Sequence, residues 1–124
     1  MVFLSDNALD SGLSYLTTNG TRVDICSQEP ANYTEATSTY TLGNKTSASV
    51  GSPQAGDTSG RKVILAAISD GSVTGTNTAT HWALSKPTAT TELLAAQSLS
   101  SSQAVTSGNT FTLGAIDIEY PDPS

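Results

Sequence analysis

Turn-forming residues interrupt most of this chain at short intervals, and this spacing restricts it to short strands. Turn signals made of Gly, Pro, Asn and Asp predict a turn about every 8 to 12 residues, and the segments between the turns are rich in β-branched side chains. Ser and Thr account for 37 of the 124 residues, and threonine suits the solvated face of a pleated strand. We therefore expect an all-β, mainly antiparallel fold, a small β-sandwich or barrel of about six to eight strands.

The N-terminal segment differs, because its apolar residues have helical spacing. In residues 4–17 they fall near one helical face. These residues are Leu4, Ala8, Leu9, Leu13 and Leu16. Ser5 or Asp6 can cap the N-terminus of such a helix. We expect a short N-terminal helix or arm over residues 1–17.

Alternating polar and apolar residues, and unbroken apolar runs, indicate where the strands lie. Residues 22–26 alternate polar and apolar side chains, which is the pattern of a half-buried strand. Residues 63–68 form an unbroken apolar run, typical of a central strand buried on both faces. Residues 92–99 suit a helix by propensity, but their length and their Ser and Thr flanks favour a strand. The expected strands are 22–26, 38–42, 47–50, 63–68, 78–85, 92–99 and 110–120, with a turn at Gly43 and Asn44.

The strand over residues 78–85 has two distinct faces. Trp82 and Leu84 share one face with Thr80, and the residues between them face the other way. We expect Trp82 to be buried on the core side, and His81 to lie on the opposite face.

The last strand, residues 110–120, contains two pairs of alternating apolar residues that are out of phase with each other. A single extra residue at Gly114 restores the register, as a β-bulge does. Asp117 and Glu119 then face away from the core.

The length of the chain is close to the commonest size of one domain, and such a domain buries about two-thirds of its unfolded surface. We expect a single β domain over residues 1–124. Residues 51–60 lack apolar periodicity and are rich in Gly, Ser and Pro, so we expect an exposed loop or arm there.

The chain is acidic, which argues against several classes of partner. Its formal net charge is −6, its sequence pI is near 4.3, and its five basic residues are spread along the chain. A nucleic-acid-binding protein needs a concentrated basic surface, so we expect no nucleic acid and no anionic membrane as partners. No apolar stretch reaches the ~18 residues that span a bilayer, and the start lacks the basic region of a secretory signal. We therefore expect synthesis in the cytosol.

The side chains that most often carry out catalysis are scarce. The chain has one histidine, His81, and one cysteine, Cys26, and no Gly-x-Ser-x-Gly turn for a nucleophile. One cysteine excludes an intrachain disulfide, and one Cys with one His cannot supply the usual zinc ligands. We expect Cys26 to be a buried small apolar residue, and the protein not to be an enzyme.

Acidic residues gather in two places, Asp6 with Asp10 and Asp117 with Glu119 and Asp122. Neither place matches the D-x-[DN]-x-[DN]-G pattern of a calcium loop. Helix capping and an exposed strand face account for both, so we expect no cofactor and no metal.

Seven segments, spread along most of the chain, carry a resemblance to known proteins. They read DNALDSGLSYLTTNGTRVDICSQEP (6–30), YTEAT (33–37), TLGNK (41–45), GRKV (60–63), SDGSVTG (69–75), ATHWAL (79–84) and TSGNTFTL (106–113). In these segments the chain resembles a group of short structural proteins of tailed bacteriophages.

This resemblance implies a structural protein of the virion, synthesised in the host cytoplasm. A small acidic β protein of this group resembles the capsid decoration or cement proteins, which implies the major capsid protein as partner and a homotrimer on the capsid surface. The N-terminal arm and the loop over residues 51–60 are then the candidate contact regions. The candidate assembly contacts are Val2, Phe3, Leu4, Leu9, Leu13, Pro53 and Gln54.

Two other functions stay open from the residues. A tail or head-tail connector protein has the same phage context and a similar size. A carbohydrate-binding module could use Trp82 or the tyrosines as stacking platforms, provided that these aromatic side chains are exposed.

Overall fold

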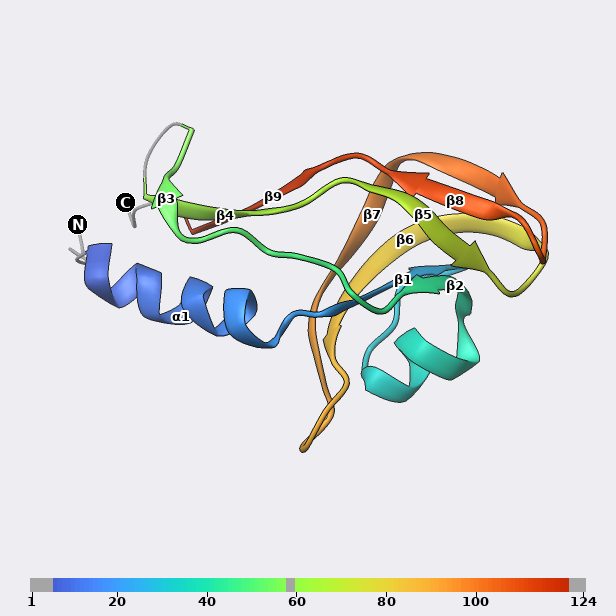
Figure 1. Ribbon diagram of the computed structural model, residues 1–124, viewed down its shortest axis with the longest axis horizontal. Helices are drawn as coiled ribbons and strands as arrows, with labels where there is room; N and C mark the ends of the chain where they lie inside the picture. Colours follow the sequence, from blue (N-terminus) through green and yellow to red (C-terminus); the bar gives the residue numbers. More distant parts are fainter. Residues whose placement is uncertain (1–5, 58–59, 121–124) are drawn as a thin grey trace.

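A computed structural model of the protein describes residues 6–57 and 60–120 (Figure 1). Helix α1 (Asp6–Asn19) comes first, and a π-helical segment η1 (Glu35–Thr39) follows the first strand. The strands are β1 (Arg22–Cys26), β2 (Thr41–Lys45), β3 (Gln54–Ala55), β4 (Arg61–Leu65), β5 (Ile68–Val73), β6 (Asn77–Lys86), β7 (Glu92–Val105), β8 (Thr110–Leu113) and β9 (Ile116–Tyr120).

Two antiparallel sheets make up the body of the protein. Six strands form the larger sheet in the order β7-β6-β1-β2-β5-β8, and β3, β4 and β9 form the smaller one. The larger sheet curls into a half-barrel, with β7 and β8 as its two end strands (Figure 1). The prediction of an all-β, mainly antiparallel fold with a short N-terminal helix is confirmed.

Helix α1 lies along the smaller sheet and packs against β4 (Figure 1). Its Leu13 side chain is fully buried in the main core. The Arg61 guanidinium of β4 donates to Asp10, with 2.8 Å between Nε and Oδ1, and the Thr17 hydroxyl donates to the Gly51 carbonyl at 2.7 Å. Of the predicted apolar face, Leu13 lies in the core and Leu16 packs against it, and the side chains of Leu4, Ala8 and Leu9 lie outside the described residues.

The helix extends to Asn19, beyond the expected end at residue 17, and it ends at a close contact. The Gly20 amide donates to the Leu16 carbonyl at 2.7 Å. A Cβ at Gly20 would lie 2.8 Å from that carbonyl oxygen and 2.9 Å from Leu84, so only glycine lets the chain pass here.

One long two-stranded ribbon joins the two sheets. β4 pairs with β9 in the smaller sheet, and their continuations, β5 and β8, pair in the larger sheet. The prediction of one strand over residues 63–68 is wrong, because the exposed residues Ala66 and Ala67 separate β4 from β5. The predicted bulge at Gly114 is also wrong, because Gly114 and Ala115 form the matching break between β8 and β9.

The strand expected over residues 38–42 is also wrong. Its first two residues belong to η1, and β2 begins only at Thr41. The turn expected at Gly43 and Asn44 lies inside β2. A Cβ at Gly43 would lie 2.5 Å from the Ser72 carbonyl oxygen of β5, so this glycine permits close strand packing rather than a turn.

The sequence does contain a signal for η1. The Asn32 side chain accepts the Glu35 amide at 2.8 Å, and the Glu35 carboxylate accepts the Ala31 amide at 2.7 Å. This pattern, with a polar cap followed three residues later by Glu, marks the start of a helix. The strand predicted for this Thr- and Ser-rich segment did not take this helix-start pattern into account.

Residues 47–60 are less regular than the rest. In the strand expected over residues 47–50, only Val50 pairs, as an isolated bridge to Leu65. The predicted loop over residues 51–60 is largely exposed where the structure describes it, and it contains the short strand β3.

The main core lies on one face of the larger sheet and under α1. It contains Leu13, Val23, Ile25, Leu42, Val50, Val63, Leu65, Ile68, Val73, Ala79, Trp82, Leu84, Val105, Phe111 and Leu113. The predicted shared face of Trp82 and Leu84 is confirmed, but Ala79 joins them instead of Thr80. A register shift between Ala79 and His81 in the pairing of β6 with β7 explains the exchange.

The strand predicted over residues 92–99 is confirmed, and it continues to Val105 as the longest strand of the described chain. In the last strand, Ile116 and Ile118 pack against the core, and Asp117 between them is exposed, as predicted, whereas Glu119 is half-buried.

Candidate functional site

The chain's only cysteine and only histidine lie opposite each other. Cys26 at the end of β1 is the cross-strand partner of His81 in β6, on the face of the sheet away from the main core. Asp24 lies two residues before Cys26, on the same face. Fifty-five positions separate Cys26 from His81 in the sequence, so only the sheet register brings these three together.

Cys26 is not prepared to act as a nucleophile. Its side chain is fully buried, and its thiol donates to the Ala36 carbonyl with 3.6 Å between Sγ and the oxygen. Burial, assisted by the nearby negative charge of Asp24, raises the pKa of the thiol to about 12. The thiolate is the reactive form of cysteine, so this group is inert at neutral pH. The prediction that Cys26 is buried is confirmed.

The Asp24 side chain likewise takes part in structural hydrogen bonds. The fully buried carboxylate accepts two hydrogen bonds from Arg22, at 2.7 and 3.1 Å, and a third from the Thr41 hydroxyl at 2.7 Å. The hydrogen bonds to Asp24 raise the pKa of Arg22. His81 instead lies 2.9 Å, at Nδ1, from the Thr80 hydroxyl. The residues of a catalytic triad are near one another, but their hydrogen bonds do not connect them.

Iodoacetamide is expected to leave Cys26 unmodified in the native protein at pH 8 and to alkylate it completely in urea. A Ser101→Cys variant, with an exposed thiol, should react at once in the native state and provides the control. Because an exposed thiol has a pKa near 9, the unfolded chain loses its proton first, and stability should fall as pH rises from about 9 towards 12. Rapid alkylation of the folded protein at Cys26 would contradict this account.

A second cluster joins the loop over residues 51–60 to the smaller sheet. Carboxylate oxygens of Asp57, Asp117 and Glu119 lie within 4.8 Å of one another. The Lys62 ammonium lies 2.5 Å from Asp57 and 3.0 Å from Asp117, and Glu119 accepts the Asp57 amide at 3.1 Å. The hydrogen bond from Lys62 lowers the pKa of Asp57, and the two carboxylates raise the pKa of Lys62. The cluster is therefore an internal ion-pair network.

The structure regroups the acidic residues singled out in the sequence. Asp10 pairs with Arg61, and Asp57, which the sequence reading had not marked, joins the group near the C-terminus. Asp122 and the side chain of Asp6 lie outside the described residues.

The predicted assembly contacts fall into three groups. Val2, Phe3, Leu4 and the side chain of Leu9 lie outside the described residues. Leu13 is fully buried within the chain's own core and offers no surface to a partner, which removes it from the contact set. Pro53 is half-buried and Gln54 exposed, so both remain accessible in the loop.

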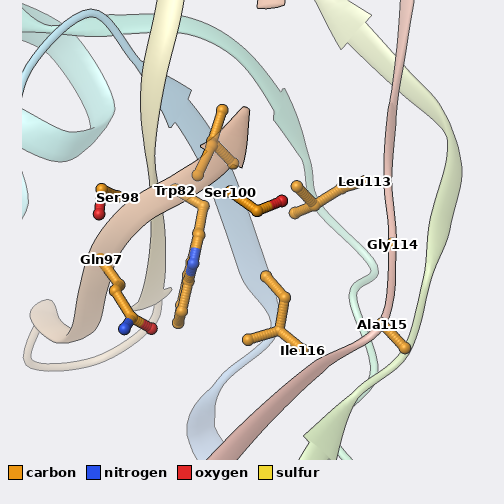
Figure 2. A pocket seen from close by; sticks show the side chains of 9 residues that line it. Trp82, Gln97, Ser98, Ser100, Leu113, Gly114, Ala115 and Ile116 are labelled. Carbon is orange, nitrogen blue, oxygen red and sulfur yellow. The ribbon is translucent and has the colours of Figure 1, made fainter. Parts of the chain in front are cut away.

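A groove runs between the two ends of the half-barrel, with β7 as one wall and β8 and β9 as the other. Its two parts have volumes of about 450 and 470 Å³ and share Trp82 and Gln97. Figure 2 shows the Trp82 indole between Gln97 of β7 and Ile116 of β9, with Ser100 and Leu113 nearby. We call this feature the seam groove.

The two walls of the seam groove meet at one end. There the Gln103 side chain of β7 donates to the Thr112 carbonyl of β8 at 3.3 Å. The first part of the groove is lined by apolar, Gln and Ser side chains, and the second adds Asp117 and Glu119 of β9. The burial of Trp82 was predicted from the sequence, but the groove that it lines was not.

No helix within the described residues is both long and apolar enough to cross a bilayer. No protein-family model, curated protein or solved structure matches this chain.

Proposed function

We propose that this protein is a structural component of a tailed-phage virion, a decoration protein that binds the outer surface of the major capsid protein lattice as a homotrimer. The observation that carries the proposal is the resemblance of residues 6–113 to short phage structural proteins. The mode of action is mechanical. Each copy bridges neighbouring capsid subunits and adds buried interface, which stabilises the assembled head by mass action.

The distribution of charge is compatible with this role. Four of the five basic residues form ion pairs within the chain: Arg22 with Asp24, Lys45 with Asp70, Arg61 with Asp10, and Lys62 with Asp57 and Asp117. The remaining one, Lys86, lies 6.0 Å from the centre of the Tyr15 ring. The chain keeps a net charge of −6, and like charge on coated particles discourages their aggregation.

Purified protein is expected to bind expanded capsids that lack it, to saturate, and to raise their temperature of disruption. Gln54→Lys, in the candidate contact loop, should weaken capsid binding about tenfold, whereas Gln28→Lys, an equally exposed glutamine outside this loop, should not. Sedimentation with capsids and a thermal melt of the particles measure both effects. Absence of capsid binding at every concentration would overturn the proposal.

Copy number distinguishes the capsid from the tail or connector. A copy number comparable with that of the major capsid protein supports decoration, and the copy number of a single ring supports the tail. The carbohydrate-binding alternative has less support, because Trp82 is only 4% exposed. Tyr15, which is 45% exposed, has Lys86 over its ring and donates its hydroxyl to Glu92 at 2.7 Å.

A further inference from the structure

Within residues 6–57 and 60–120 the half-barrel stops short of closure, and each of its two ends has an edge without a strand partner. Among these residues β7 pairs with β6 alone, and β8 and β9 pair with β5 and β4 alone. These edges form the two walls of the seam groove. An unpaired edge offers a row of backbone N–H and C=O groups, and an extended peptide adds to such an edge as a further strand.

Over residues 93–105 the β7 edge lacks charge and proline, two of the features that normally prevent such addition, although register shifts interrupt its pairing with β6 opposite Ala79–His81 and Leu84–Ser85. Residues 93–105 contain no charged residue and no proline, although the chain as a whole is acidic. Natural edge strands usually carry Lys, Pro or a bulge to block pairing, or they are short. β7 is instead the longest strand of the described chain.

The side chains of the seam groove that lie next to the core are apolar. Trp82 forms the floor, and Leu99, Leu113 and Ile116 line the sides. These side chains belong to the core or pack directly against it. Trp82 and Leu113 are already buried, so an added strand would cover mainly the half-buried Leu99 and Ile116, with every second side chain facing the groove.

Charge indicates what kind of chain this strand comes from. The β9 end of the groove adjoins three carboxylates, Asp57, Asp117 and Glu119, with only the Lys62 ammonium among them. An excess of negative charge remains, and it favours a basic residue on the occupant. A second copy of this chain is poorly suited, because its basic residues are already held in internal ion pairs or over Tyr15.

We propose that the seam groove binds an extended segment of a different protein, which adds to the β7 edge as a strand. Alternate apolar side chains of the segment face Trp82, and a Lys or Arg lies near Asp117 and Glu119. The inference rests on the groove and its charges and does not depend on the capsid role.

Trp82 supplies the measurement, because it is the only tryptophan and lies at the floor of the groove. The probe is a synthetic peptide of about ten residues, roughly 33 Å when extended, with alternating Val and Thr and two Lys at one end. We expect a saturable change in Trp82 fluorescence. A peptide ending in two Glu should bind about tenfold more weakly at low salt, and the difference should shrink in high salt. A peptide with Pro at alternate positions should not bind, because it cannot donate to the edge.

Adjacent serines of β7 offer a matched pair of variants. Ser100 lines the groove, whereas Ser101 is exposed but not part of its lining. Ser100→Phe should weaken binding of the Lys-ended peptide about tenfold, and Ser101→Phe should leave it nearly unchanged. Gln97→Lys should reverse the preference between the Lys-ended and Glu-ended peptides, which a folding defect would not do.

Three results would overturn the proposal. One is no response to the Lys-ended peptide in the native protein, and another is equal binding of the Pro-containing peptide. The third is self-association of the protein that Ser100→Phe abolishes, which would identify a second copy as the occupant. Capsid binding could still occur in each case, so failure here is distinct from failure of the decoration proposal.

Discussion

Replacing Asp24 with alanine is expected to lower the free energy of unfolding by about 3 to 5 kcal/mol. The carboxylate is fully buried and holds three hydrogen bonds, two from Arg22 and one from Thr41. Its removal leaves a largely buried guanidinium and a hydroxyl without their partner, and neither can be fully rehydrated inside the sheet. Urea denaturation, with the slope compared between variants, measures the loss.

Asp70 provides the control for this prediction. It also forms an ion pair, with Lys45 at 2.9 Å, but its side chain is 67% exposed. Exposed pairs contribute about 0 to 1 kcal/mol, so Asp70→Ala should change stability by no more than that. Similar losses in the two variants would contradict a structural role for the Arg22–Asp24 pair.

Replacing Gly71 with alanine is expected to cost about 3 kcal/mol, the upper part of the range for an overfilled core. Gly71 in β5 is paired with Phe111 in β8, and the phenyl ring covers it. A Cβ at Gly71 would lie 2.2 Å from two ring atoms of a side chain that is only 2% exposed. The ring must shift, and with it the core on which β8 packs.

Gly114→Ala is the matched control, because a Cβ there has nothing within 4 Å and should change stability by less than about 0.5 kcal/mol. A double variant tests the cause. Phe111→Leu removes the ring, so it should make the added methyl group of Gly71→Ala less costly than in the native background. Additive effects of the two substitutions would show that the ring contact is not responsible.

Local patterns predicted the elements whose signals are periodic. The helical spacing around Leu13 found α1, and alternation found β1, the buried face of β6 and the outward direction of Asp117. These predictions succeed because the direction of a side chain within one helix or strand follows from its position in that element. The same reasoning missed η1, whose signal is a single cap at Asn32 followed three residues later by Glu35.

Local sequence patterns did not predict the strand breaks at residues 66–67 and 114–115. An unbroken apolar run does not reveal that two small alanines in its middle are exposed while the strand passes from one sheet to the other. The position of the break depends on the partner strand, which is about fifty residues away in the sequence. Likewise, Gly43 resembles a turn residue in isolation, and only the approach of β5 explains it.

By itself, the sequence determined the class of fold, the buried Trp82 and Cys26, and the scarcity of reactive side chains, because these follow from composition and from spacing within one element. Tertiary structure alone decided that Cys26 faces His81, that Asp57 meets Asp117 around Lys62, and that β7 and β8 end a half-barrel with a groove between them. The reason is that sheet register and curl join segments far apart in the chain, and each pairing depends on all the others packing around one core.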